Sequence, residues 1–94
     1  MNKKPQAQLQ QEINEMAKTI KPGAIYVHYK NPAHTYKVLQ LAINTEDDSV
    51  WVVYQSLYDE QVVFLRSAAE WCEEVEKDGR KMKRFYRIGE QVRL

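Results

Sequence analysis

The sequence predicts a mainly β domain with two helices, either a small SH3-like antiparallel barrel or a curved sheet, with an N-terminal amphipathic helix. Hydrophobic residues repeat with a helical period before Pro22. After Pro22-Gly23 the period changes to two, and the residues become β-branched and aromatic. A short segment from Ser67 onward carries helix signals again before a last strand.

The composition predicts one small domain without a strong electrostatic field. The 94 residues are 44% hydrophobic, and 14 basic against 13 acidic residues give a formal net charge of +1. A near-neutral chain does not attract nucleic acid or anionic membranes as a whole, so any such partner needs a local patch. The single cysteine, Cys72, excludes an intramolecular disulfide and suits a reducing compartment. With no signal peptide and no membrane-spanning run, we expect a cytoplasmic chain without membrane contact.

The first expected element is an amphipathic helix over residues 6–20. Its apolar stripe consists of Leu9, Ile13, Met16, Ala17 and Ile20. These spacings keep the stripe on one side of a helix. We therefore divide the chain into an N-terminal helical extension, residues 1–21, and a small β-rich domain, residues 22–94. Docking of the stripe on its own domain is favoured, and self-association into a homo-oligomer stays open as the alternative.

Five strands are expected after Pro22. They are residues 24–30, 35–44, 50–58, 62–66 and 83–88. Turn residues such as Asn31-Pro32 and Asp59-Glu60 separate consecutive strands, which indicates an antiparallel meander. Four strands, a short helix and a closing strand is the order of elements in SH3-like barrels. An open sheet packed against two helices is the alternative that periodicity does not exclude.

A second helix is expected over residues 67–77. Ser67 followed by Glu70 forms a capping box, and Asp78-Gly79 offers a left-handed helix end. Trp71 and Cys72 lie on the apolar face of this helix, so both are expected in the core.

Catalysis and metal binding have little support in the sequence. His28 and His34 border one hairpin, but zinc needs at least one further ligand, and Cys72 lies on a different element. The serines lack a glycine-rich elbow, and the three glycines are isolated, which excludes a phosphate-cradling loop. We expect no metal, no cofactor and no enzymatic activity.

A basic and aromatic run near the carboxyl end is a candidate nucleic-acid surface. Lys83, Arg84 and Arg87 flank Phe85 and Tyr86, a mixture that suits phosphate and stacking contacts. The preceding segment is rich in glutamate, so the alternative is a solvated surface on which these charges neutralise one another.

The chain resembles a bacterial and phage family known as domain of unknown function sixteen fifty-three. The motifs that carry the resemblance are Pro22-Gly23, Tyr26-x-His28-Tyr29-Lys30, Tyr36-x-Val38, Ala42, Val52-Val53-Tyr54-Gln55-x-Leu57-Tyr58, Arg66 and Arg84-Phe85. The sequence departs from the family pattern at Asn31, at Thr45-Glu46-Asp47 and at the segment 64–67. The resemblance implies a compact β-rich domain and singles out polar residues, namely His28, Lys30, Glu46, Gln55 and Arg66.

These observations predict a binding module rather than an enzyme. Tyr26, His28 and Lys30 alternate onto one face of the first expected strand. The expected ligand-binding residues are Tyr26, His28, Lys30, Tyr36, Glu46, Gln55 and Arg66. Aromatic walls with a few cationic donors suit a planar anionic ligand, such as a nucleotide, a modified base or a short nucleic acid. The alternative is a protein-interaction or self-association module that uses the N-terminal helix and exposed aromatic residues.

Overall fold

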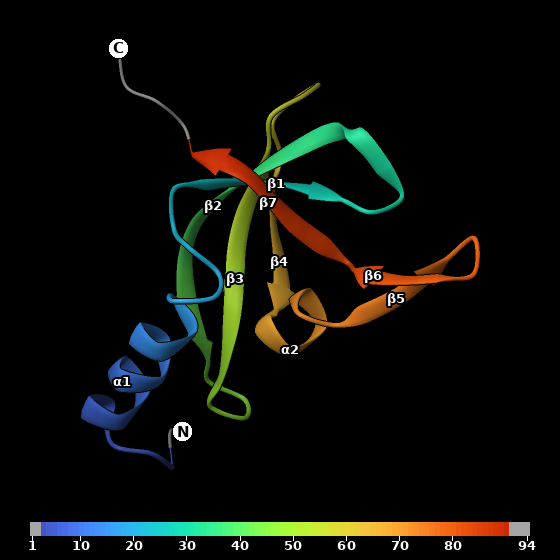
Figure 1. The fold of residues 1–94 in the computed structure, drawn as a ribbon. Helices are drawn as coiled ribbons and strands as arrows, with labels where there is room; N and C mark the ends of the chain where they lie inside the picture. Colours follow the sequence, from blue (N-terminus) through green and yellow to red (C-terminus); the bar gives the residue numbers. More distant parts are fainter. Residues whose placement is uncertain (1–2, 91–94) are drawn as a thin grey trace.

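The computed structural model of the chain describes residues 3–90 (Figure 1). Its elements are α1 (Gln6–Met16), β1 (Ala24–His28), β2 (Asn31–Asn44), β3 (Ser49–Ser56), β4 (Val63–Ser67), α2 (Ala68–Trp71), β5 (Glu74–Lys77), β6 (Arg80–Lys83) and β7 (Phe85–Glu90). The prediction of a mainly β chain with two helices is confirmed. No helix of the described residues is long and apolar enough to cross a membrane.

Five strands form one antiparallel sheet in the order β4-β3-β2-β1-β7, and β5 and β6 form a separate two-stranded sheet. Within the described residues, the edge strands β4 and β7 pair with β3 and β1, and not with each other. The sheet is therefore not closed into a barrel: the barrel alternative is wrong, and an open antiparallel sheet, the other predicted alternative, is what the structure shows. The last strand, β7, lies beside β1, so β4 and β7 form the two edges of the sheet.

Irregular pairing bends three of the four strand pairs in this sheet. The register shifts between Val27 and His28 in β1, again between β1 and β7, and between Val38 and Gln40 in β2. Extra residues of this kind bend a strand and increase its twist. The pairing of β3 with β4 runs from Gln55–Val63 to Trp51–Ser67 without a shift.

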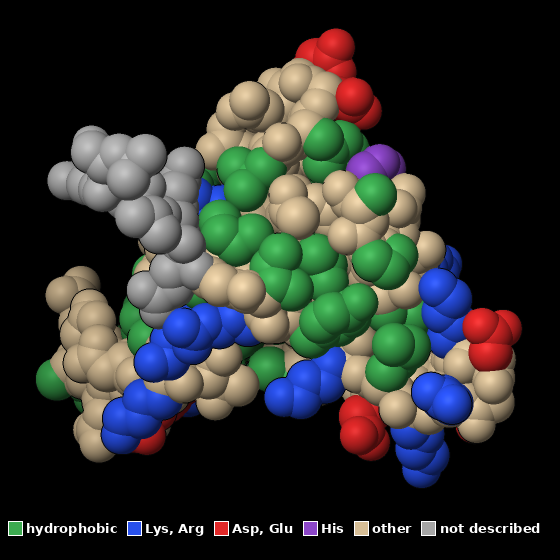
Figure 2. Space-filling view, turned by 45° about the horizontal axis from the view of Figure 1, so that its top comes forward, with side chains coloured by type: hydrophobic (Ala, Val, Ile, Leu, Met, Phe, Trp, Pro, Cys, Tyr) green, Lys and Arg blue, Asp and Glu red, His purple; other side chains and the backbone are tan. Residues whose placement is uncertain are grey.

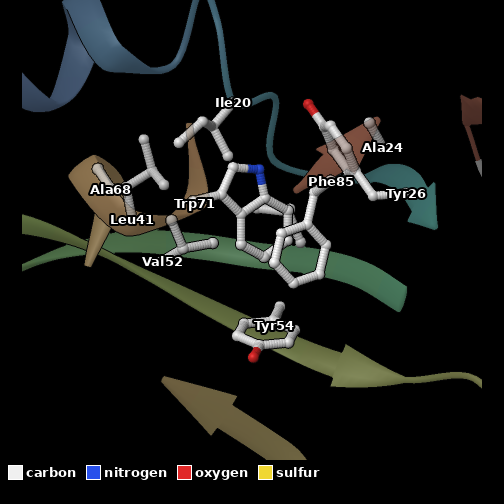
Figure 3. Packing of buried hydrophobic residues seen from close by; sticks show 10 residues of the cluster. Ile20, Ala24, Tyr26, Leu41, Val52, Tyr54, Ala68, Trp71 and Phe85 are labelled. Atoms are coloured by element: carbon white, nitrogen blue, oxygen red, sulfur yellow. The ribbon is translucent and has the colours of Figure 1, made fainter. Parts of the chain in front are cut away.

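An aromatic stack forms the centre of the core. The Trp71 and Phe85 rings lie 3.8 Å apart, centroid to centroid, with 3° between their planes. Tyr26 and Tyr54 contact Trp71 edge to face. Four aromatic residues from separate elements therefore pack against one another (Figure 3). Trp71 is buried as the sequence predicted, but Cys72 is exposed, so the prediction of a core cysteine is wrong. The helix ends at Trp71, and Cys72 is its C-terminal cap rather than part of a buried face.

The second helix is much shorter than expected. Ser67 Oγ accepts a hydrogen bond from the Glu70 backbone N–H at 3.1 Å, which confirms the helix start. The chain then leaves the helix and forms the β5–β6 hairpin, whose turn holds Asp78 at φ 54° and Gly79 at φ 76°. Two positive φ angles in an Asp-Gly pair characterise a tight hairpin turn. The helix prediction for 72–77 is wrong because Asp-Gly is a helix-end signal and a hairpin signal at once.

The N-terminal helix packs on its own sheet. Leu9 is buried, and Ile13, Met16 and Ala17 pack against the core (Figure 1). Helix α1 ends at Met16, and backbone hydrogen bonds continue through turns to Ile20. In this structure the apolar stripe of the helix is docked on its own domain, the arrangement that the sequence favoured.

Candidate functional site

A pocket of about 250 Å³ draws side chains from all five strands of the large sheet. It is lined by His28 of β1, Tyr36 of β2, Tyr54 of β3, Phe64 and Arg66 of β4, and Phe85 of β7. Strand pairing brings these residues together, since His28 lies opposite Phe85 and Tyr54 lies opposite Phe64. The structure thus gathers three of the predicted ligand-binding residues, His28, Tyr36 and Arg66.

Arg66 provides the positive charge of the pocket. Its Nη1 donates to Glu70 Oε2 at 2.8 Å, and its Nε donates to Tyr54 Oη at 3.4 Å. The guanidinium carbon lies 5.4 Å from the centroid of the Phe85 ring, within the range of a cation–π contact. These contacts hold the guanidinium against the aromatic wall and use only two of its three nitrogens.

His28 is a neutral hydrogen-bonding group beside this charge. Burial lowers the pKa of His28, and the positive charges of Arg66, Arg84 and Lys30 lower it further. The imidazole Nδ1 accepts a hydrogen bond from the Lys30 backbone N–H at 3.2 Å. Because Nδ1 is the acceptor, the proton of the neutral ring lies on Nε2. The His28 ring also meets the Phe85 ring edge to face at 5.0 Å.

Tyr36 connects the pocket to an aromatic row that the sequence did not single out. Its hydroxyl lies 2.7 Å from the hydroxyl of Tyr58, and the His34 ring stacks on Tyr58 at 3.9 Å. Burial, followed by the hydrogen bond to Tyr58, raises the pKa of Tyr36, so this phenol keeps its proton at neutral pH.

Tyr54 and Phe64 line the pocket as well, although the sequence did not predict them as site residues. Their alternation with core residues was visible in the sequence, but it does not distinguish a core wall from a pocket wall.

Tyr26 and Gln55, both predicted ligand-binding residues, lie outside the pocket. Tyr26 is buried in the core, where its hydroxyl accepts from the Lys21 N–H at 3.1 Å and donates to the Thr19 carbonyl at 3.3 Å. Gln55 alternates with Tyr54 along β3 and faces the other side of the sheet, where its Nε2 donates to the Gln61 carbonyl at 2.9 Å. Both side chains have structural partners in place of a ligand.

Lys30 and Glu46 lie in turns rather than at the pocket. Lys30 is exposed beyond the end of β1, with its Nζ 5.9 Å from the Tyr29 ring centroid. Glu46 is exposed in the turn between β2 and β3, where it lines a different hollow with Lys3 and Lys4. The expectation that these side chains converge with His28 is not met, because β1 ends at His28 and Glu46 lies at the opposite end of β2.

The three cations of the candidate nucleic-acid surface separate in the structure. Arg84 Nη2 pairs with Glu73 Oε1 at 2.8 Å, and Arg84 Nε donates to the Glu70 carbonyl at 3.2 Å. Lys83 and Arg87 instead line a second cavity of about 400 Å³. The other lining residues of this cavity are Thr19, Ile20, Tyr26, Trp71, Cys72, Phe85 and Tyr86. The Phe85 ring is common to both hollows.

The described residues contain no cluster of side chains that could bind a metal ion. Within residues 3–90, no group of three or more His, Cys, Asp or Glu side chains is placed to hold an ion. The two histidine rings have different partners: the His28 ring contacts Phe85, and the His34 ring stacks on Tyr58.

Residues 24–87 match the family described as Protein of unknown function (DUF1653). The chain belongs to this family. A crystal structure of a DUF1653 protein from Bordetella bronchiseptica is similar, with a TM-score of 0.65 and 33% sequence identity over 79% of this chain and 94% of that chain. Among curated proteins, none matches the chain. The matched segment contains all six residues of the candidate pocket.

Proposed function

We propose that this DUF1653 chain is a non-catalytic binding module that holds a planar anionic ligand in the pocket between His28 and Arg66. The observation that supports it is the position of the Arg66 guanidinium, which lies 5.4 Å from the Phe85 ring centroid in a pocket with three further aromatic rings. A cation held among aromatic faces is an arrangement that binds the charge and the plane of one ligand together.

The chemistry of the lining residues indicates which parts of a ligand they would bind. Arg66 uses Nε and Nη1 for protein hydrogen bonds, so its Nη2 is available for a phosphate or carboxylate oxygen. The neutral His28 ring offers an Nε2–H donor, and the rings of Tyr36 and Tyr54 offer stacking faces. Because 250 Å³ is below the usual range for drug-sized ligands, we favour a single base or nucleotide over a long ligand.

The same residues support binding rather than turnover. The lowered pKa of His28 keeps its ring uncharged at neutral pH. Tyr36 is a poor nucleophile because its pKa is raised. Neither group forms the pair of nucleophile and oriented base that covalent catalysis requires.

Nucleic-acid binding through the second cavity is the other candidate. Lys83, Tyr86 and Arg87 all line this hollow of about 400 Å³, which supports contact with a phosphate and a stacked base. Arg84 is less suited to that role, because it is already paired with Glu73.

Titration of the isotopically labelled chain, followed by NMR chemical shifts, tests the two sites. Nucleoside monophosphates of all four bases and a single-stranded oligonucleotide at low salt are added separately. We expect saturable shifts at His28, Tyr36 and Phe85 with a monophosphate. Arg66→Ala should weaken this binding by about 10- to 100-fold, as expected for loss of a charge-assisted hydrogen bond.

Arg84→Ala is the matched control, since Arg84 is also a half-buried arginine paired with a glutamate at 2.8 Å. It should reduce the affinity far less than Arg66→Ala does, because Arg84 acts on the pocket only through its charge. Equal affinity of Arg66→Ala and the parent chain would contradict the pocket. Weaker oligonucleotide binding by Lys83→Ala, with Arg66→Ala unaffected, would favour the second cavity instead.

A further inference from the structure

Strand β4 presents an open hydrogen-bonding edge. In the described residues it lies at the end of the sheet order and pairs with β3 alone (Figure 1). The Val62 carbonyl accepts from the Ser56 N–H at 3.0 Å, so the main-chain groups of residue 62 face β3. Main-chain groups alternate in direction along an antiparallel strand. Those of Val63 and Leu65, and the Ser67 N–H, therefore point away from β3, toward the free edge, while the Ser67 carbonyl begins helix α2.

This edge has few of the features that usually protect an edge strand. Such strands are blunted by charged residues, prolines or bulges. The pairing of β3 with β4 has no register shift, and the side chains of Val63 and Leu65 are 52% and 64% exposed. Arg66, the one charged residue of β4, turns inward over the Phe85 ring and is the one protective feature of this kind on the strand. Independently of this edge, Figure 2 shows one face of the molecule on which hydrophobic side chains gather, with lysine and arginine side chains beside them.

We propose that β4 is a self-association surface, on which a second copy of this chain pairs antiparallel through its own β4. A two-fold axis at Leu65 uses the full length of the strand, from Val63 to Ser67. Leu65 then lies opposite the partner subunit's Leu65, and Val63 lies opposite the partner subunit's Ser67. Leu65 can exchange both main-chain hydrogen bonds with its copy, and the outward Ser67 N–H can donate to the carbonyl of the partner subunit's Val63, so the two edges match at the axis and on both sides of it.

The side-chain pattern of β4 is complementary to itself in this register. Phe64 lies opposite the partner subunit's Arg66, so the two arginines are not directly opposed. Leu65 meets its own copy on the other face, which buries the most exposed side chain of the strand. A peptide of unrelated sequence would have no reason to reproduce this alternation.

The pairing would place two candidate pockets next to each other. Phe64 and Arg66 line the pocket and share one face of β4, so antiparallel pairing brings the same face of the partner's strand alongside. Self-association does not depend on the proposed ligand, however, because the open edge exists without it. The test is therefore made in the absence of ligand, and its outcome is independent of the nucleotide titration.

Sedimentation of the full chain over a concentration series up to about 1 mM, a range that detects even weak complexes, measures the association. We expect a monomer–dimer equilibrium. Leu65→Lys should make the chain monomeric, since it sets two like charges opposite each other. Ile88→Lys is the matched control, because Ile88 is 57% exposed on the other edge strand, β7, and this variant should still dimerise.

Two further variants test the main-chain contact and the register. Leu65→Pro removes an outward N–H and leaves the β3-facing groups in place, so it should keep the fold, as judged by circular dichroism, and lose the dimer. Leu65→Lys mixed with Leu65→Glu should restore a dimer, because opposite charges then meet at the axis. A parent chain that stays monomeric throughout, a dimer that survives both Leu65→Lys and Leu65→Pro, or a mixture that remains monomeric would each overturn the proposal.

Discussion

The Phe85 ring separates two regions built from the same kinds of side chain. On one side, Trp71 stacks on it at 3.8 Å, and Tyr26 closes the contact, so this region is core. On the other, Arg66 lies 5.4 Å from its centroid, and His28 and Tyr36 leave a pocket of about 250 Å³. Aromatic residues therefore stabilise the fold where packing closes around them, and they line an open hollow where a charged residue lies among them.

Removal of the Trp71 ring should give the largest effect on this comparison. Trp71 is 2% exposed and contacts three other aromatic rings, so Trp71→Ala is expected to lower the free energy of unfolding by about 3–5 kcal/mol. Urea denaturation measures the loss. Trp51→Ala is the control, because Trp51 is only partly buried and its Nε1 binds the neighbouring Ser49 hydroxyl. A larger cost for Trp51→Ala would mean that the core has been wrongly located.

A moderate effect is expected on the pocket side, from loss of the tyrosine pair. Tyr36→Phe removes the 2.7 Å contact with the Tyr58 hydroxyl and keeps the ring. The free energy of unfolding should fall by about 0.5–1.5 kcal/mol, the usual value of one such hydrogen bond. Thermal or urea melts would measure it, with Tyr58→Phe and the double variant completing a cycle. Additive losses in the double variant would contradict a direct bond between the two hydroxyls.

The smallest effect should be a pH dependence that comes from His28. Its pKa is lowered from the ordinary value of 6.5 in the folded chain, so below that value the unfolded chain binds more protons. The stability contributed by neutral His28 is then complete above pH 6.5 and is lost as the pH falls toward the lowered pKa. His28→Gln should flatten this acid-side loss in melts between neutral and acidic pH. His34→Gln serves as the comparison, and an unchanged slope in His28→Gln would contradict a lowered pKa of His28 in the folded chain.

Much of the local structure was predictable from the sequence. The predictions that failed concern segments whose structure is decided by pairing with another strand. The strands at 24–30, 35–44, 50–58 and 62–66 and the helix start at Ser67 correspond to observed elements. The helix expected through 72–77 failed because Asp78-Gly79 fits either a helix end or a hairpin turn, and the partner strand decides between them. Lys30 was expected beside His28 by alternation, but β1 ends at His28, and the register shifts just before it.

By itself, the sequence determined the mainly β class, the amphipathic helix, the aromatic and basic residues available for a site, and the likeness to the DUF1653 family. These follow from local periodicity, turn chemistry and short motifs, each of which spans a few residues. The tertiary structure alone decided that the sheet stays open, that Tyr26 is core while His28 is pocket, and that Arg66 meets Phe85. Those outcomes depend on pairing between strands far apart in the chain. A period of two specifies which residues share a face, but not which strand will lie beside it.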